Sequence, residues 1–271
     1  MRRLARLRKR LFGLDTMLYC DLKIPLDPTF NPSTSIESAT QMILDALAVM
    51  GPEYVANIRT GLTNRWVDYA DNVGKSTGAF CSSPYGAHPY ILITWGDTMR
   101  SAFVLAHELG HAGHFALANK YQRLTNTRPS LYFIEAPSTM NEMLLADHVL
   151  HRTRDARMRR WVISQLLGTY YHNFVTHLLE GELQRRIYRL ADAGASITAK
   201  LLCEQKADVL TSFWGIRWTL TKGQVSHGCA NRITTWASTR TRTPLASPRL
   251  RPSPSAFAKK VRPQQRSGSK Y

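Results

Sequence analysis

The acidic residues of this chain stop well before its end. Residues 216–271 hold 12 of the 36 Lys and Arg residues but none of the 19 Asp and Glu residues. They also lack a sustained apolar period and contain runs such as TRTRTP and SPRLRPSPS, so their composition predicts disorder. A packed core must therefore be built from residues 1–215, whose formal charge is 24 minus 19, or only +5.

The overall composition excludes several classes of protein. Hydrophobic residues make up 44% of the chain and charged residues 20%, which excludes a wholly disordered chain, a collagen and a disulfide-stabilised miniprotein. The net charge of +17 suggests a nucleic-acid binder, but most of it belongs to residues 216–271. We therefore expect no specific nucleic-acid partner, and a non-enzymatic basic nucleic-acid-binding protein is kept as the alternative.

The cysteines and the lengths of the apolar runs indicate the cellular compartment in which we expect the protein. The four cysteines show no C-x-x-C spacing, which fits a reducing compartment and predicts a cytoplasmic protein: Cys20, Cys81, Cys203 and Cys229. No apolar run approaches the roughly 20 residues that cross a bilayer, so we expect no membrane partner. The Arg-rich start, MRRLARLRKRLFGLD, is interpreted as a solvated helix face rather than a transit peptide or a membrane-surface helix.

Apolar residues recur at helical spacing over most of the first 215 residues. This pattern predicts helices at 33–50, 53–62, 97–119 with Asp97 as N-cap, 135–150, 155–190 and 198–214. One convincing strand is predicted, in HPYILITW at residues 88–95. The fold class expected for the body is mainly α.

The helix predicted after this strand contains His107-Glu108-Leu109-Gly110-His111, an H-E-x-x-H motif. Two histidines four residues apart lie on one helix face, so both imidazoles can bind one Zn²⁺ while the adjacent glutamate points toward the water at the metal. The alternative is a helix with surface histidines and an ion-pairing glutamate. The apolar helix and the preceding strand favour the metal site.

A catalytic zinc site needs a third protein ligand. The extended metzincin pattern is excluded because His114 and Leu117 occupy the positions that require Gly and His. Downstream carboxylates are the other solution, and Glu135 and Glu142 lie seven residues apart on one face of the following helix. On residue spacing alone, both remain candidates.

Two segments resemble a known family. Residues 74–114, GKSTGAFCSSPYGAHPYILITWGDTMRSAFVLAHELGHAGH, and 133–150, FIEAPSTMNEMLLADHVL, are similar to the catalytic core of the oligoendopeptidase F group of the M3 (thimet oligopeptidase-like) family of zinc peptidases. The resemblance covers nearly all of residues 1–215. It implies an incomplete zincin-type catalytic core, mainly α with a small edge β-sheet, that hydrolyses peptide bonds in oligopeptides.

The resemblance also implies roles for individual residues. His107, His111 and Glu135 would bind one Zn²⁺ per chain, and Glu108 would be the general base. Glu142 would be either a neighbour that supports the site or a solvated helix glutamate. Residues 77–80, with Gly78, Ala79 and Phe80, would form the edge strand on which a peptide substrate lies, unless they are an ordinary loop. We expect His114, His148 and His151 to be packing or surface residues.

The chain departs from the family at both ends. Family members are much longer, so we expect this chain to start inside the parent protein. After Gly215 the basic segment replaces a family segment with a His-Tyr-Tyr run, whose tyrosines supply hydrogen-bond donors opposite the zinc. A shifted reading of the codons for Ala230–Ala246 permits Gln-Pro-His-Tyr-Tyr-Met-Gly-Leu-Tyr-Pro-Tyr-Thr-Tyr-Ser-Ala-Gly, which is that segment. We therefore hypothesise that residues 216–271 are translated out of frame.

These departures predict weak zinc binding and slow or undetectable hydrolysis, because loss of one oxyanion donor costs roughly 10²- to 10³-fold in rate. A folded but inactive zinc-binding fragment is a further alternative. The sequence makes no prediction of oligomeric state.

Overall fold

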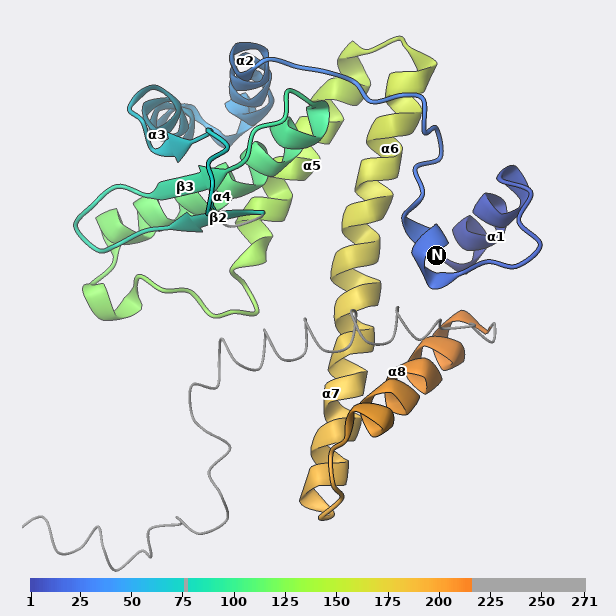
Figure 1. The fold of residues 1–271 in the computed structure, drawn as a ribbon. Helices are drawn as coiled ribbons and strands as arrows, with labels where there is room; N and C mark the ends of the chain where they lie inside the picture. Colours follow the sequence, from blue (N-terminus) through green and yellow to red (C-terminus); the bar gives the residue numbers. More distant parts are fainter. Residues whose placement is uncertain (76–77, 216–271) are drawn as a thin grey trace, which may run out of the picture. The chain divides into compact units, whose positions relative to one another are not determined.

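A computed structural model describes residues 1–75 and 78–215 (Figure 1). The predictions of disorder and of a frame error concern residues 216–271, outside the described residues. Contacts divide the chain into two units, Met1–Glu182 and Leu183–Tyr271. Among the described residues, no helix is both long enough and apolar enough to cross a membrane.

The described elements are mostly helical, with one small sheet, which confirms the predicted fold class. In chain order they are α1 (Arg2–Leu11), the 3₁₀ turn η1 (Tyr19–Lys23), α2 (Ile36–Ala46), η2 (Leu47–Met50), α3 (Pro52–Thr63), β1 (Val67–Asp68), β2 (Ala79–Ser82), β3 (Tyr90–Ile93), α4 (Met99–Tyr121), η3 (Leu124–Asn126), α5 (Glu135–Arg152), α6 (Ala156–Tyr170), the π-helical segment η4 (Tyr171–Thr176), α7 (His177–Asp192) and α8 (Ala199–Trp214).

The start of α4 corrects one prediction. Asp97 is not the N-cap, because its backbone has φ +50° and its carboxylate accepts a hydrogen bond from Trp95 Nε1 at 2.7 Å. Thr98 caps the helix instead, in extended backbone geometry, with its hydroxyl oxygen accepting from the Ser101 amide at 3.3 Å. The helix that carries the H-E-x-x-H motif thus begins at Met99, two residues after the predicted start.

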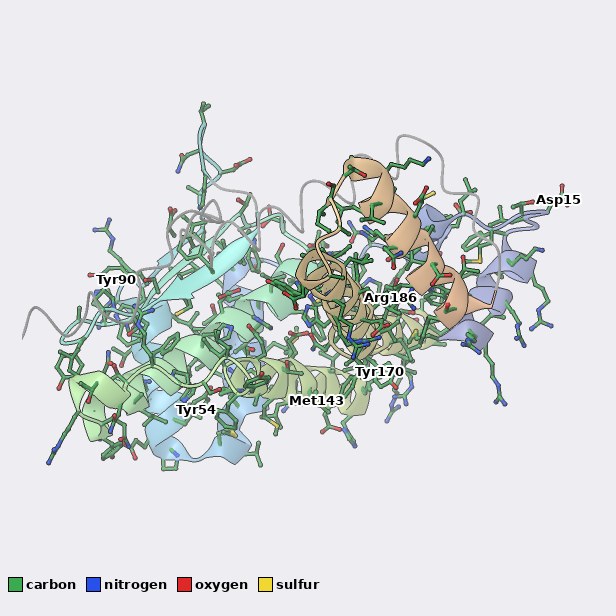
Figure 2. The ribbon with its side chains drawn as sticks, turned by 90° about the horizontal axis from the view of Figure 1, so that it is seen from below. Asp15, Tyr54, Tyr90, Met143, Tyr170 and Arg186 are labelled. Carbon is green, nitrogen blue, oxygen red and sulfur yellow. The ribbon has the colours of Figure 1, made fainter. Side chains whose placement is uncertain are left out.

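The sheet has the strand order β1-β3-β2, with β1 parallel and β2 antiparallel to β3. Ile91 and Ile93 of β3 are each 2% exposed, whereas Phe80 of β2 and Tyr90 of β3 are each 49% exposed. Figure 2 labels Tyr90 among the side chains. This alternation is typical of a sheet with one covered face. The strand order puts β2 at an edge among the described strands. The strand predicted at 88–95 is shorter in the structure. It is joined by β1, which was not predicted, and by β2, which was expected only from the family resemblance.

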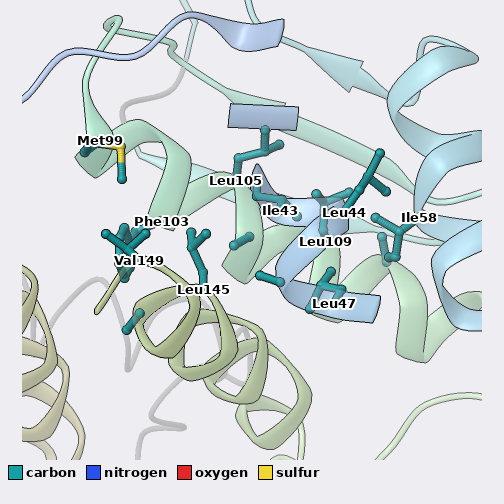
Figure 3. Packing of buried hydrophobic residues seen from close by; sticks show 14 of the residues in the cluster. Ile43, Leu44, Leu47, Ile58, Met99, Phe103, Leu105, Leu109, Leu145 and Val149 are labelled. Carbon is teal, nitrogen blue, oxygen red and sulfur yellow. The ribbon is translucent and has the colours of Figure 1, made fainter. Parts of the chain in front are cut away.

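The core of the first unit forms around α4, which contacts α2, α3, α5, β2 and β3. Figure 3 shows its close packing, in which side chains of α4 meet those of α2, α3 and α5. Burying a leucine or isoleucine contributes about 1.5–3 kcal/mol, so these contacts hold α4 firmly. The central members are all less than 2% exposed: Ile43, Leu47, Ile58, Leu105, Leu109 and Leu145.

The second unit contains the end of α7 and the whole of α8. Arg186 of α7 forms an ion pair with Asp208 of α8. Val209, Leu210 and Trp214 of α8 are buried. Gly215 ends the helix with φ +67°, a left-handed conformation that favours glycine at this position.

Candidate functional site

The two motif histidines lie together on α4. The His107 and His111 rings are 5.0 Å apart between centroids and nearly perpendicular. Glu135, the first residue of α5, brings Oε2 to 3.2 Å from His107 Nε2 and 3.3 Å from His111 Nε2. The structure therefore brings the three predicted ligands together, although they come from two helices.

Gly110 lets α5 come this close to α4. A Cβ at Gly110 would lie 2.6 Å from both the Pro137 carbonyl oxygen and Ser138 Cα. Both atoms belong to the backbone of the first part of α5, so neither can move aside cheaply. Ser138 Oγ also donates to Glu135 Oε2 at 2.9 Å. The glycine inside the motif thus allows the contact that brings the Glu135 carboxylate to the histidines.

A buried polar pair fixes α5 against α4 beside His107. Tyr54 of α3 donates its hydroxyl hydrogen to Asn141 Oδ1 at 3.1 Å, and Asn141 Nδ2 donates to the Ala106 carbonyl at 3.1 Å. Tyr54 is 8% exposed and Asn141 1% exposed. Burial raises the pKa of Tyr54 despite the opposing effect of its bond to Asn141. These bonds join α3, α5 and the α4 backbone immediately before the motif.

The three groups fit a divalent metal. One donor atom each from His107, His111 and Glu135 lies within 4.8 Å of the others. Tetrahedral coordination with bonds of about 2.0–2.1 Å places ligand atoms about 3.3–3.4 Å apart, close to the 3.2 and 3.3 Å found here. Two imidazoles and a carboxylate also form a recognised donor set for a catalytic metal with one position left for water or substrate.

The charges of the site favour a cation. Hydrogen bonds from His107 and His111 hold the pKa of Glu135 far below its usual value. Burial alone would lower the pKa of His107, but Glu135 and Glu142 outweigh it and raise that pKa to about 10. The carboxylates thus stabilise positive charge at His107. In the metal-free chain a proton on the ring supplies that charge, and a metal ion can take the place of this proton.

Glu108 differs from a surface glutamate. It is 5% exposed, and Oε2 is buried without a hydrogen-bond partner among the described residues. Burial raises its pKa, while the nearby His107 and His111 partly oppose this shift. A raised pKa makes the carboxylate a better proton acceptor, as general-base chemistry requires.

Glu142 contacts the far side of His107. Its Oε1 accepts a hydrogen bond from His107 Nδ1 at 2.5 Å, and its Oε2 accepts one from Thr169 Oγ1 at 3.0 Å. Sequence reasoning did not single out Thr169, because a threonine near the end of an amphipathic helix carries no signal of such a contact. His111 has no matching bond among the described residues, since its Nδ1 is buried and unpartnered there.

The predicted edge-strand residues are not members of the metal-binding group. Gly78 has φ +97° and precedes β2, whose first two residues are Ala79 and Phe80. The next residue, Cys81, has its pKa raised to about 12 by burial and by the charge of Glu108. β2 packs against α4, the helix that carries the motif glutamate. Nothing in the sequence pattern had pointed to Cys81.

The three histidines that we expect to be packing or surface residues are not in the ligand group: His114, His148 and His151. The His114 ring stacks on Phe115 with centroids 6.0 Å apart, and meets the Phe133 ring edge-on at 5.8 Å. Burial lowers the pKa of His148 on α5. His151 Nδ1 contacts the Asp147 carbonyl oxygen at 2.9 Å on the exposed end of the same helix.

Comparison with known families gives one match over most of the chain. The model described as Peptidase family M3 matches residues 2–234. Oligopeptidase PepF of Bacillus subtilis (strain 168) is 32% identical over 215 residues, which are 79% of this chain and 32% of that protein. An oligoendopeptidase F homolog of Borreliella burgdorferi is 29% identical over 210 residues, covering 77% of this chain and 36% of its own length. This chain spans about a third of the length of these relatives.

Solved structures agree on the fold. A putative peptidase from Chlamydophila abortus superposes with a TM-score of 0.67 at 26% identity, over 83% of this chain and 38% of that one. A putative oligoendopeptidase F from Bacillus anthracis str. Ames gives a TM-score of 0.63 at 17% identity, over 86% and 44%. The second likeness concerns the fold alone.

Proposed function

The chain belongs to peptidase family M3, and from this premise we propose that it carries the catalytic centre of a zinc-dependent endopeptidase acting on oligopeptides. The observation that carries the proposal is the convergence of His107, His111 and Glu135 at ligand spacing, with Glu108 buried beside them. The names of the relatives support peptides as the substrate class. The predicted cytoplasmic location stays a prediction.

His107, His111 and Glu135 would hold one zinc ion per chain. A bound zinc would polarise the substrate carbonyl and lower the pKa of a water molecule toward about 7. Glu108 would accept the proton of that water as it attacks the carbonyl, and would then return the proton to the leaving amine. Its burial and raised pKa support this role.

Glu142 would orient His107. A histidine that binds a metal through Nε2 keeps its proton on Nδ1, and a carboxylate that accepts this proton fixes the ring. The 2.5 Å contact between His107 Nδ1 and Glu142 Oε1 supports this assignment over that of a solvated glutamate.

The edge strand would bind the peptide. We propose that substrate adds to the outer edge of β2, so that Gly78, Ala79 and Phe80 offer backbone groups while the peptide's side chains point alternately to the two faces of the sheet. Support comes from the position of β2 at the end of the order β1-β3-β2 and from its packing against α4, the helix that carries the motif.

Glu108→Gln tests the proposed chemistry. The zinc-loaded wild-type chain should cleave a quenched oligopeptide slowly, and Glu108→Gln should abolish this cleavage while keeping the same zinc content. Glu204→Gln is a matched control, because Glu204 lies on α8 with its side chain 58% exposed. Equal rates for wild type and Glu108→Gln, or no cleavage by zinc-loaded wild type, would contradict the proposed activity of this chain.

A further inference from the structure

Both oxygens of the Glu142 carboxylate have partners. Oε1 accepts from His107 on α4, and Oε2 accepts from Thr169 on α6. The Glu142 side chain is only 16% exposed, so water competes little for either bond. One carboxylate from α5 thus connects a proposed metal ligand to a hydroxyl on a third helix.

The Thr169 hydroxyl bonds to a side chain of another helix, unlike the hydroxyls of Thr60 and Ser164. Thr60 and Ser164 donate to the carbonyl four residues earlier in their own helices, at 2.9 and 2.8 Å. This back-bond is the ordinary choice for a helical hydroxyl. Thr169 instead donates across to Glu142 at 3.0 Å. A hydroxyl has one hydrogen and a carboxylate can only accept, so the direction of this bond is fixed.

A carboxylate held at one oxygen can still rotate about its terminal bond. The second bond removes this freedom and fixes the plane in which Oε1 meets His107 Nδ1. The His107 ring then keeps Nε2 directed toward Glu135 and His111, as the 3.2 Å contact with Glu135 shows. Partners that orient a metal ligand in this way commonly change metal affinity about 10- to 100-fold.

We propose that Thr169 is a positioning residue, whose hydroxyl holds Glu142 in the orientation that aims His107 Nε2 at the metal. The inference rests on the proposed function, because it takes His107 as a zinc ligand. It adds a residue from α6 to a site otherwise built from α4 and α5.

The test compares variants that keep or remove the hydroxyl. Thr169→Val removes the donor at nearly unchanged shape, and Thr169→Ser keeps it. Ser164→Ala is the matched control, since Ser164 is on the same helix and its hydroxyl donates to the Arg160 carbonyl of that helix. The zinc dissociation constant of the full chain is measured by competition with a chromophoric chelator. The ¹H–¹⁵N resonance of His107 Nδ1–H is followed in the metal-free chain.

Thr169→Val should weaken zinc binding about three- to tenfold, because one hydrogen bond of the orienting group is lost. The His107 Nδ1–H resonance should shift in the same variant. The zinc dissociation constants of Thr169→Ser, which keeps the hydroxyl, and of Ser164→Ala, which lies away from the contact, should stay within about twofold of wild type. In a Glu142→Gln background, Thr169→Val should add no further loss, because it acts through Glu142.

Unchanged zinc affinity and an unchanged resonance in Thr169→Val would overturn the inference. The same holds if the variant only lowers thermal stability, since Thr169 would then merely join two helices. If Thr169→Val does not fold, Thr169→Ala is measured against the same criteria. A wild-type chain that binds no zinc overturns the proposed function as well, whereas zinc-binding wild type with an unaffected Thr169→Val overturns this inference alone.

Discussion

At Gly110 the contact between α4 and α5 leaves no room for a methyl group. Gly110→Ala would press a Cβ against the backbone of Pro137 and Ser138, so we expect it to cost about 1–3 kcal/mol in the free energy of unfolding. Zinc affinity should also fall, because α5 carries Glu135. Urea unfolding and a zinc titration measure the two effects.

Gly181→Ala is the control for this prediction. Gly181 lies inside α7, and an added Cβ would meet nothing within 4 Å. Alanine is preferred over glycine in a helix, so this variant should be neutral or slightly more stable. If Gly110→Ala behaves like Gly181→Ala, the account of the α4–α5 contact is wrong.

A buried hydroxyl gives a second prediction at the residue scale. Tyr54→Phe removes the donor to Asn141 and leaves Oδ1 buried, which should cost about 1–3 kcal/mol in stability. Tyr54 is labelled in Figure 2. Thermal or denaturant unfolding measures the effect, with Tyr85→Phe as control because Tyr85 is 51% exposed. A loss no larger in Tyr54→Phe than in Tyr85→Phe would rule out a stabilising Tyr54–Asn141 bond.

Sequence and structure differ in what they reveal about single residues. The i, i+4 spacing predicts that His107 and His111 share a helix face, since helix geometry alone dictates it. Glu135 could be chosen over Glu142 only with the help of the family resemblance. The contacts of Gly110 and Thr169 could not be predicted, because each depends on a second helix placed by tertiary packing.

At the scale of elements, Lys75 connects two strands. Its Nζ donates to the carbonyl oxygens of Asp68 at 3.1 Å and Ile93 at 3.0 Å, and also to that of Ala70. The Lys75 side chain is only 4% exposed. One ammonium group therefore holds the ends of β1 and β3 together, immediately before the segment that leads into β2.

Lys75→Met should loosen this sheet. Three carbonyl groups would lose their donor, which should cost about 1–3 kcal/mol in stability and speed amide exchange in β2 and β3. Hydrogen exchange measured by mass spectrometry tests this, with Lys200→Met as control because that side chain is 86% exposed. Equal exchange in both variants would show that Lys75 does not hold the strands.

The helices were predictable from sequence because their apolar period and their caps agree. Ser35 accepts from the Ser38 amide at 3.2 Å and Gly51 follows η2, close to the predicted limits of 33–50. The sheet was harder to predict. β1 has two residues and is a strand only because it pairs with β3. A sequence pattern within so short a segment cannot predict a pairing partner elsewhere in the chain.

For the whole molecule, zinc binding should stabilise the folded chain. A ligand that binds only the folded state adds about 2.7 kcal/mol at 100 times its dissociation constant. Thermal unfolding should therefore shift upward with zinc and return to the metal-free value with a chelator. Glu135→Gln should reduce this shift, and a shift of the same size in that variant would argue against Glu135 as a ligand.

The chain belongs to peptidase family M3 but spans only about a third of the length of its relatives. The described residues nevertheless bring together both motif histidines, the glutamate of α5 and the buried motif glutamate. The central claim is thus that the site is built within the first unit and binds metal there.

The most direct test is the zinc stoichiometry of the purified chain, measured by equilibrium dialysis and elemental analysis for wild type, His107→Ala and Glu108→Gln. At a free zinc concentration that saturates wild type, the account predicts one zinc per chain in wild type and Glu108→Gln, and a large loss in His107→Ala. A wild-type chain without zinc, or a His107→Ala chain that retains as much as wild type, would contradict it.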